Sequence, residues 1–204
     1  MERGHKLIEH LADKIQRAPM QTDPWEHIII DNFLPSGVFL EILDVVNETN
    51  TGIKEGAAKK FQTIIDTRES TEHKEFWNDW YNVFESDIIT DVLRNRFKIT
   101  EKFNFMRCDI HKCEDGFTLG EHNDIKKNNK HILSLQIYLP QDDLASGDGV
   151  VLHDITDSSG SNDKPIEMLP NRAWIFNCGP NTFHSVPKCT RTRHSVLMKN
   201  VVVG

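Results

Sequence analysis

The sequence has few cysteines, no long apolar run and fewer basic than acidic residues, and each shortage excludes a class of protein. Its four cysteines include no CxxC pair, and a zinc site built on cysteines needs ligands closer together. We therefore expect free thiols in a reducing compartment. No apolar segment approaches the roughly 20 residues of a membrane span, and the first residues lack the apolar centre of a signal peptide. These shortages predict a cytoplasmic protein that does not span a membrane.

The charge balance argues against nucleic acid as a partner. The chain has 24 basic and 31 acidic residues and a net charge of −7. Non-specific nucleic-acid binding requires clustered Lys and Arg, and the one tight basic group, at residues 126–130, is typical of a solvated loop. With 204 residues, of which 38% are hydrophobic, the chain has the size of one domain. We expect a single domain over residues 1–204.

The first hundred residues are predicted to be mainly helical. Apolar residues recur at helical spacing from Leu7 to Ile15, and again after Ser36, which can cap a helix. A third amphipathic stretch, from Phe76 to Leu93, carries large aromatic residues that favour packing against a sheet. A short extended run, His27–Ile30, lies between the first two helices.

From about residue 101 the apolar pattern changes to period two, in short segments separated by Gly, Asp and Ser. The predicted strands are Phe103–His111, His131–Leu139, Gly149–Ile155, Arg172–Cys178, Asn181–Val186 and Arg193–Val203. Short strands at regular spacing are typical of a β-sandwich or barrel. We therefore expect an α+β fold with a mainly β core in residues 101–204, supported by N-terminal helices from residues 1–100 packed on one outer face.

His122 and Asp124 are the first chemically specific feature. Residues two apart on an extended chain point the same way, so the imidazole and the carboxylate can share one metal ion. Because HxD is a common pattern, it needs a third ligand. His184 lies in an extended apolar run, where an unsatisfied imidazole is costly to bury, although alone it is also compatible with a hydrogen-bonded core histidine. Two histidines and one carboxylate leave three positions open and suit non-heme iron(II).

Two further strands add polar groups to the same site. Arg193 and Ser195 share a face, and a guanidinium beside a hydroxyl suits a carboxylate. Ser134, Gln136 and Tyr138 share a face too polar for a dry core, and Tyr138 either donates to the same carboxylate or packs as an ordinary strand tyrosine. Two other histidines are not expected to bind the metal, because one lacks a carboxylate two residues away and the other faces away from the arginine; these are His153 and His194.

This constellation resembles the 2-oxoglutarate/Fe(II)-dependent oxygenase superfamily, especially its prolyl-4-hydroxylase-like branch. The family pattern is HxD, a distal His and an Arg about nine residues later in an RxS element. It is matched here by His122, Asp124, His184, Arg193 and Ser195. Tyr138 stands where branch members have the tyrosine that steadies the co-substrate. The resemblance spans the chain and is strongest over residues 103–203. Departures are Asp148, which interrupts a Gly-Gly turn, and Ile110 with His111, which stand where relatives often have a site tyrosine.

The resemblance implies a double-stranded β-helix, or jelly roll, with the site in one mouth. It implies a dioxygenase that uses Fe(II), 2-oxoglutarate and O2, hydroxylates its substrate, and releases succinate and CO2. The implied catalytic metal ligands are His122, Asp124 and His184, and the implied co-substrate residues are Arg193, Ser195 and Tyr138.

The substrate and two other functions stay open at this point. The branch favours a peptidyl-proline or another side chain, while a small amino acid, a sugar or a modified base is also compatible. The loops Glu114–Gly120, Lys126–Lys130 and Asp157–Lys164 are predicted to line the entrance. The competing functions are a non-catalytic metal-binding jelly-roll sensor and a cupin-like zinc or manganese isomerase or hydrolase. The Arg193 clamp argues against a sensor, since a sensor has no need to grip a dicarboxylate.

Overall fold

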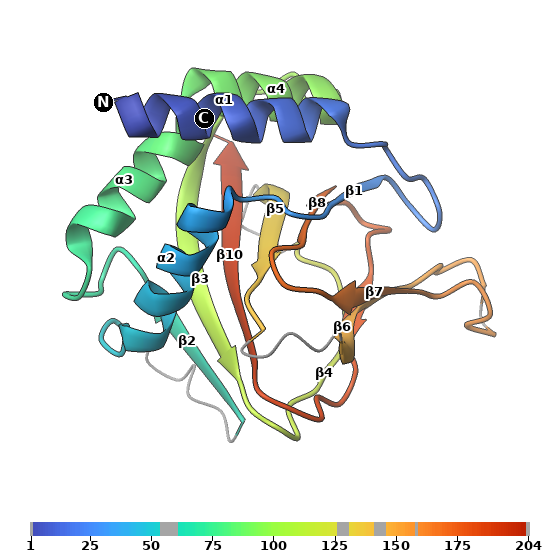
Figure 1. Ribbon diagram of the computed structural model, residues 1–204. Coiled ribbons are helices and arrows are strands. Elements are labelled where there is room, and N and C mark those ends of the chain that lie inside the picture. The colour runs from blue at the N-terminus through green and yellow to red at the C-terminus, as the bar shows by residue number, and fades with distance from the viewer. Residues whose placement is uncertain (1, 54–60, 126–130, 141–145, 158, 203–204) are drawn as a thin grey trace.

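The computed structural model describes residues 2–53, 61–125, 131–140, 146–157 and 159–202 (Figure 1). Its helices are α1 (Glu2–Arg17), α2 (Ser36–Glu48), α3 (Lys74–Phe84) and α4 (Asp87–Phe97). Among these residues, no helix is both long and apolar enough to cross a membrane. The four cysteines are free and buried, as expected.

Two antiparallel sheets form the β core. The larger sheet has the strand order β1-β8-β5-β10-β3-β2, and the smaller has the order β4-β9-β6-β7. The larger sheet contains β1 (His27–Ile30), β2 (Gln62–Asp66), β3 (Phe103–Cys113), β5 (His131–Tyr138), β8 (Ala173–Asn177) and β10 (Arg193–Val202). The smaller contains β4 (Leu119–His122), β6 (Ser146–Leu152), β7 (Lys164–Met168) and β9 (His184–Val186). This arrangement confirms the predicted jelly roll.

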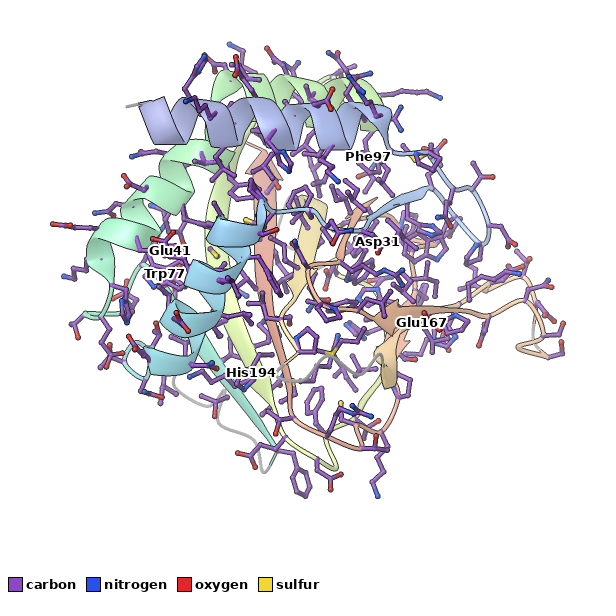
Figure 2. The ribbon with its side chains drawn as sticks, viewed as in Figure 1. Asp31, Glu41, Trp77, Phe97, Glu167 and His194 are labelled. Atoms are coloured by element: carbon purple, nitrogen blue, oxygen red, sulfur yellow. The ribbon has the colours of Figure 1, made fainter. Side chains whose placement is uncertain are left out.

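The two faces of the larger sheet bury different sets of side chains. Its outer face packs against the helices in one apolar cluster, to which Leu11, Trp77 and Leu93 contribute from the helices, and Ile110, Leu135 and Val196 from the strands. Figure 2 labels Trp77, which lies between α3 and this sheet. Its inner face packs against the smaller sheet in a second cluster, which includes Tyr138, Trp174 and Phe176 from one sheet and Leu152, Ile166 and Val186 from the other. The site predicted above therefore lies on the inner face.

Both edges of the larger sheet come from the first hundred residues, which are thus more than a helical support. β1 pairs with β8, and β2 pairs with β3. The β1 edge is held by Arg172, whose guanidinium contacts both carboxylate oxygens of Asp31 at 2.6 and 3.1 Å. The predicted amphipathic stretch from Phe76 to Leu93 is two helices, because α3 ends at Phe84 and Ser86 accepts a hydrogen bond from Ile89 N to cap α4.

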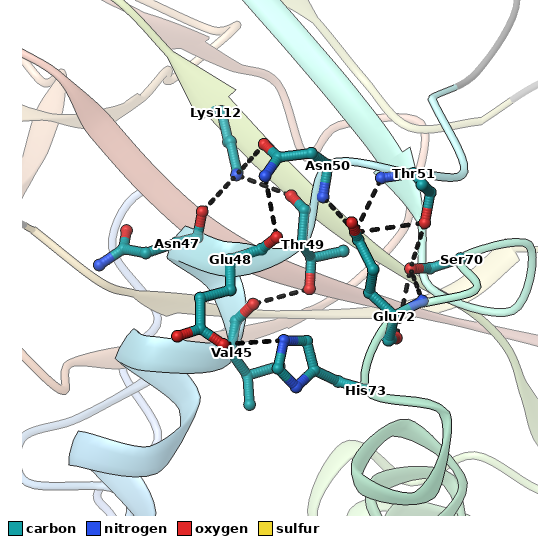
Figure 3. Close-up of polar contacts among 10 residues, drawn as sticks. All are labelled: Val45, Asn47, Glu48, Thr49, Asn50, Thr51, Ser70, Glu72, His73 and Lys112. Carbon is teal, nitrogen blue, oxygen red and sulfur yellow. Dashed lines mark hydrogen bonds and ion pairs between the residues drawn. The ribbon is translucent and has the colours of Figure 1, made fainter.

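The end of α2 is anchored to β3 by Lys112. Its ammonium donates hydrogen bonds to the carbonyl of Asn47 at 3.3 Å and to that of Thr49 at 2.8 Å (Figure 3). The final carbonyls of a helix lack intrahelical partners and carry partial negative charge, so a cation there is stabilising. The same figure shows Glu72 accepting hydrogen bonds from the backbone that follows α2. The helix thus has a fixed position on the outer face of the sheet.

His194 lies on this outer face (Figure 2), and Lys112 is its cross-strand partner in the pairing of β10 with β3. Burial lowers the pKa of His194 to about 4, and the charge of Lys112 acts in the same direction. In the unfolded chain this imidazole takes a proton near pH 6.5. Between these two values the unfolded state binds more protons than the folded state, so His194 makes the protein less stable as the pH falls.

We expect a His194→Gln variant to lose part of this pH dependence. Between pH 7 and pH 5 the free energy of unfolding of the metal-free wild type should fall by about 1–2 kcal/mol more than that of the variant. Urea unfolding with a chelator present measures both slopes. His5→Gln, an exposed position on α1, is the matched control. Equal slopes in the wild type and the His194→Gln variant would contradict the prediction.

Candidate metal centre

His122, Asp124 and His184 meet at one point. Each offers one ligand atom, and these atoms lie within 4.8 Å of one another. His122 ends β4 and His184 begins β9, and the two residues are direct cross-strand partners. Strand pairing therefore brings together residues about sixty positions apart in the chain. Among the described residues, these three form the group that could hold a metal ion.

The two imidazoles are oriented in the same way. Nδ1 of His122 lies 2.9 Å from the carbonyl of Gly120, and Nδ1 of His184 lies 3.2 Å from that of Thr182. A carbonyl can only accept, so each Nδ1 carries the proton and each Nε2 keeps its lone pair for a metal. His184 packs against the edges of Trp174 and Phe176. Burial lowers the pKa of His184 to about 4, which keeps it in the neutral, metal-binding form.

Asp124 is held as a carboxylate by two donors. Ser134 donates a hydrogen bond to Oδ2 at 2.9 Å, and the Lys199 ammonium lies 3.2 Å from Oδ1. Burial opposes ionisation, but the charge of Lys199 and the Ser134 hydroxyl outweigh it and lower the pKa of Asp124 to about 2. Two carboxylate oxygens offer about four acceptor positions, so the carboxylate can bind a metal while keeping both donors.

Arg193 and Tyr138 form a second buried polar group on the inner face. They are 3% and 0% exposed, and the guanidinium carbon lies 5.3 Å from the centre of the phenol ring. Within the described structure, Nε and Nη2 of Arg193 and the Tyr138 hydroxyl have no hydrogen-bond partner. Burial raises the pKa of Tyr138 and outweighs the opposite effect of the nearby Arg193 guanidinium, so the hydroxyl keeps its proton. Buried donors without partners are costly, and an anion with several oxygens would satisfy them together.

Ser195 sits next to this group, opposite Tyr138 in the β10–β5 pairing. Its oxygen accepts a hydrogen bond from Gln136 at 2.8 Å, and Gln136 in turn accepts one from the Trp174 indole at 2.9 Å. The Ser195 hydroxyl hydrogen can therefore still be donated to a ligand. On β3, the other neighbour of β10, His111 is the cross-strand partner of Ser195. His111 stands at the position where the resemblance expects a tyrosine.

The two histidines that were not expected to bind metal lie apart from this group. Both ring nitrogens of His153 are engaged, Nδ1 by Asp163 at 2.8 Å and Nε2 by Ser185 at 2.7 Å. His194 lies on the outer face. Of the loops predicted at the entrance, Lys126–Lys130 falls outside the described residues, while the described part of Asp157–Lys164 lies between β6 and β7 and ends with the first residue of β7.

Lys199 is the site residue that the sequence analysis missed. A signal was present, because Lys199 has the same strand parity as Arg193 and Ser195. A lysine near the end of a strand is usually solvent-exposed, however, and its contact with Asp124 joins positions that are 75 residues apart.

Two histidines and a carboxylate between jelly-roll sheets, with a buried arginine on the same inner face, define the class of non-heme iron oxygenases. Residues 108–199 match the family model described as the 2OG-Fe(II) oxygenase superfamily. This match contains every one of the site residues discussed above. The predicted resemblance to the 2OG-Fe(II) oxygenase superfamily is confirmed over residues 108–199, and this match supports a 2-oxoglutarate-dependent dioxygenase that uses Fe(II), 2-oxoglutarate and O2.

Solved structures agree on the fold. A 2OG-Fe(II) oxygenase family oxidoreductase from Burkholderia pseudomallei superposes with a TM-score of 0.67 at 12% identity, covering 95% of this chain and 89% of that one. A Pseudomonas putida prolyl-4-hydroxylase gives 0.64 at 14% identity, covering 97% and 100%. A Trichoplax adhaerens prolyl hydroxylase in complex with a hypoxia inducible factor peptide fragment gives 0.65 at 14%, covering 98% and 91%. No curated protein sequence matches this chain.

Proposed function

We propose that the protein is a hydroxylase in which His122, Asp124 and His184 hold Fe(II), and Arg193, Tyr138 and Ser195 hold the far carboxylate of 2-oxoglutarate. The observation that carries the proposal is that Arg193 and Tyr138 are buried on the same inner face as the metal-binding group and carry donors without a hydrogen-bond partner among the described residues. One dicarboxylate molecule could bind at both positions, with one carboxylate at the metal and the other at the Arg193 guanidinium.

The protein's side chains hold the metal ligands in position and exclude water from the site. The Nδ1 hydrogen bonds fix both imidazole rings with Nε2 toward the metal. Trp174 and Phe176 pack beside His184 and shield the site. When bound, Fe(II) and 2-oxoglutarate supply the oxidative chemistry, in which O2 is consumed, 2-oxoglutarate becomes succinate and CO2, and a substrate C–H bond becomes an alcohol.

For the substrate, we propose a peptidyl-proline or another side chain of a polypeptide. Support comes from the fold shared with prolyl hydroxylases, one of which was solved with a bound peptide fragment. Loops vary more than the elements that they connect, so the predicted entrance loops are expected to decide which substrate enters. A panel of proline-containing peptides, followed by mass spectrometry for a gain of one oxygen atom, tests this part separately from the chemistry at iron.

The core of the proposal is tested without knowing the substrate. We expect the protein, supplied with Fe(II), 2-oxoglutarate and O2, to form succinate slowly even when no substrate is added. The measurement is succinate produced with and without added Fe(II), alongside 2-oxoglutarate binding under anaerobic conditions. Metal binding without 2-oxoglutarate binding or succinate would favour the non-catalytic sensor. A protein that retains zinc or manganese and shows no iron-dependent turnover would favour the cupin-like alternative.

A further inference from the structure

Lys199 contacts the metal-binding group from the larger sheet. It lies on β10, and its ammonium nitrogen is 3.2 Å from Oδ1 of Asp124. Both side chains are only 12% exposed. Lys199 stands opposite Ser134 in the β10–β5 pairing, and Ser134 donates to the other carboxylate oxygen. Asp124 is therefore held by side chains from both strands: Lys199 on β10 supplies a charge, and Ser134 on β5 supplies a neutral hydroxyl.

The next strand supplies a second cation, but that cation is already balanced. Arg107 on β3 is the other cross-strand neighbour of Lys199. Its guanidinium lies 2.6 Å from the carboxylate of Asp109, whose side chain is 1% exposed. Lys199 has a different situation, because its anionic partner, Asp124, is also a proposed ligand of the metal. Once a divalent cation takes the charge of Asp124, Lys199 becomes an uncompensated positive charge one carboxylate away from that cation.

We propose that Lys199 is a positioning residue that holds Asp124 and also shifts the binding preference of the site from the metal toward the anionic co-substrate. Its hydrogen bond occupies part of Oδ1 and so favours coordination through a single oxygen, which leaves positions open on the metal. Its charge repels the metal and attracts the carboxylate end of 2-oxoglutarate that approaches the metal. This inference rests on the function proposed above.

The two effects of the charge have opposite signs, and this distinguishes the proposal from a purely structural role. An ammonium a few ångströms away in a partly buried site disfavours a second cation and favours an anion. Removing it should therefore strengthen metal binding and weaken 2-oxoglutarate binding. If Lys199 acted only as a support for Asp124, its loss would disorder the ligand and weaken both.

The test is a pair of binding titrations on Lys199→Met, with redox-inert Mn(II) in place of Fe(II). We expect the affinity for Mn(II) to rise about threefold to tenfold, and the affinity of the Mn(II)-loaded protein for 2-oxoglutarate to fall about tenfold. Lys199→Arg should restore 2-oxoglutarate binding to within about threefold of wild type, because it keeps the charge. Lys74→Met, which removes an exposed lysine on α3, is the matched control and should change neither value.

The outcomes separate this inference from the proposed function. A parallel loss of Mn(II) and 2-oxoglutarate binding in a folded Lys199→Met variant, or unchanged 2-oxoglutarate binding, overturns the role of Lys199. If the methionine variant does not fold, Lys199→Gln gives the same comparison, since it removes the charge but keeps a donor near Asp124. A wild-type protein that binds neither Mn(II) nor 2-oxoglutarate overturns the proposed function instead.

Discussion

An Asp124→Ala variant is expected to bind Fe(II) at least about 100-fold more weakly than wild type and to form no succinate above background. Loss of a residue that merely supports a metal ligand typically costs 10- to 100-fold in affinity, and Asp124 is proposed as a ligand itself. It is also the one anionic member of the group, so its removal leaves two neutral imidazoles and a nearby ammonium around a divalent cation. Anaerobic Fe(II) titration and succinate formation measure the two losses.

The control variants account for the buried ion pair between Asp124 and Lys199, which the Asp124→Ala substitution breaks. Without Asp124, the ammonium of Lys199 loses its partner in a site that is largely closed to solvent, and such a charge is destabilising. Asp124→Asn keeps the shape of the side chain and a hydrogen-bond acceptor for Ser134, so it should fold and still bind the metal poorly. Asp91→Ala removes an exposed carboxylate on α4 and should leave both measurements unchanged. Wild-type Fe(II) affinity in a folded Asp124→Asn variant would exclude Asp124 as a ligand.

Most of the site could be predicted because strand periodicity assigns side chains to faces. The two-residue spacing of His122 and Asp124 places both groups on one side of an extended segment, and the same parity applies to Arg193 with Ser195. The resemblance then linked these pairs to His184. The structure adds the register that no local pattern contains, namely the direct pairing of residue 122 with residue 184 and of residue 195 with residue 138.

The parts of the fold that were not predicted are short or depend on long-range pairing. β4 and β7 have four and five residues, which is too short for alternation to be clear, whereas β9 lies within the predicted strand Asn181–Val186. β2 lies among helices, and its residues are a strand because β3 provides partners for its backbone. Helical periodicity continues from α3 into α4, so the sequence pattern predicted one amphipathic stretch and did not show the break at Ser86. The contact of Lys199 with Asp124 requires the folded sheet, and periodicity alone cannot supply it.

Replacing Arg193 by leucine is expected to raise the KM for 2-oxoglutarate at least about 100-fold while leaving Fe(II) affinity within about twofold of wild type. Two hydrogen bonds from a buried guanidinium to a carboxylate contribute roughly 1.5–3 kcal/mol each, which corresponds to a loss of 100-fold or more. Leucine removes the buried guanidinium and fills part of its space with an apolar side chain, so the protein should fold. Tyr138→Phe removes one neutral hydroxyl and should cost only about tenfold.

The separation of the two affinities is the decisive measurement. Arg193 is absent from the group that can hold the metal, and its donors have no partner within the described structure, so its loss should act on the dicarboxylate alone. Arg17→Leu, which removes an exposed arginine from α1, controls for the loss of one positive charge. Unchanged 2-oxoglutarate affinity in a folded Arg193→Leu variant would mean that the co-substrate is held elsewhere on the inner face. Equal loss of Fe(II) and 2-oxoglutarate would mean that Arg193 supports the sheet rather than a ligand.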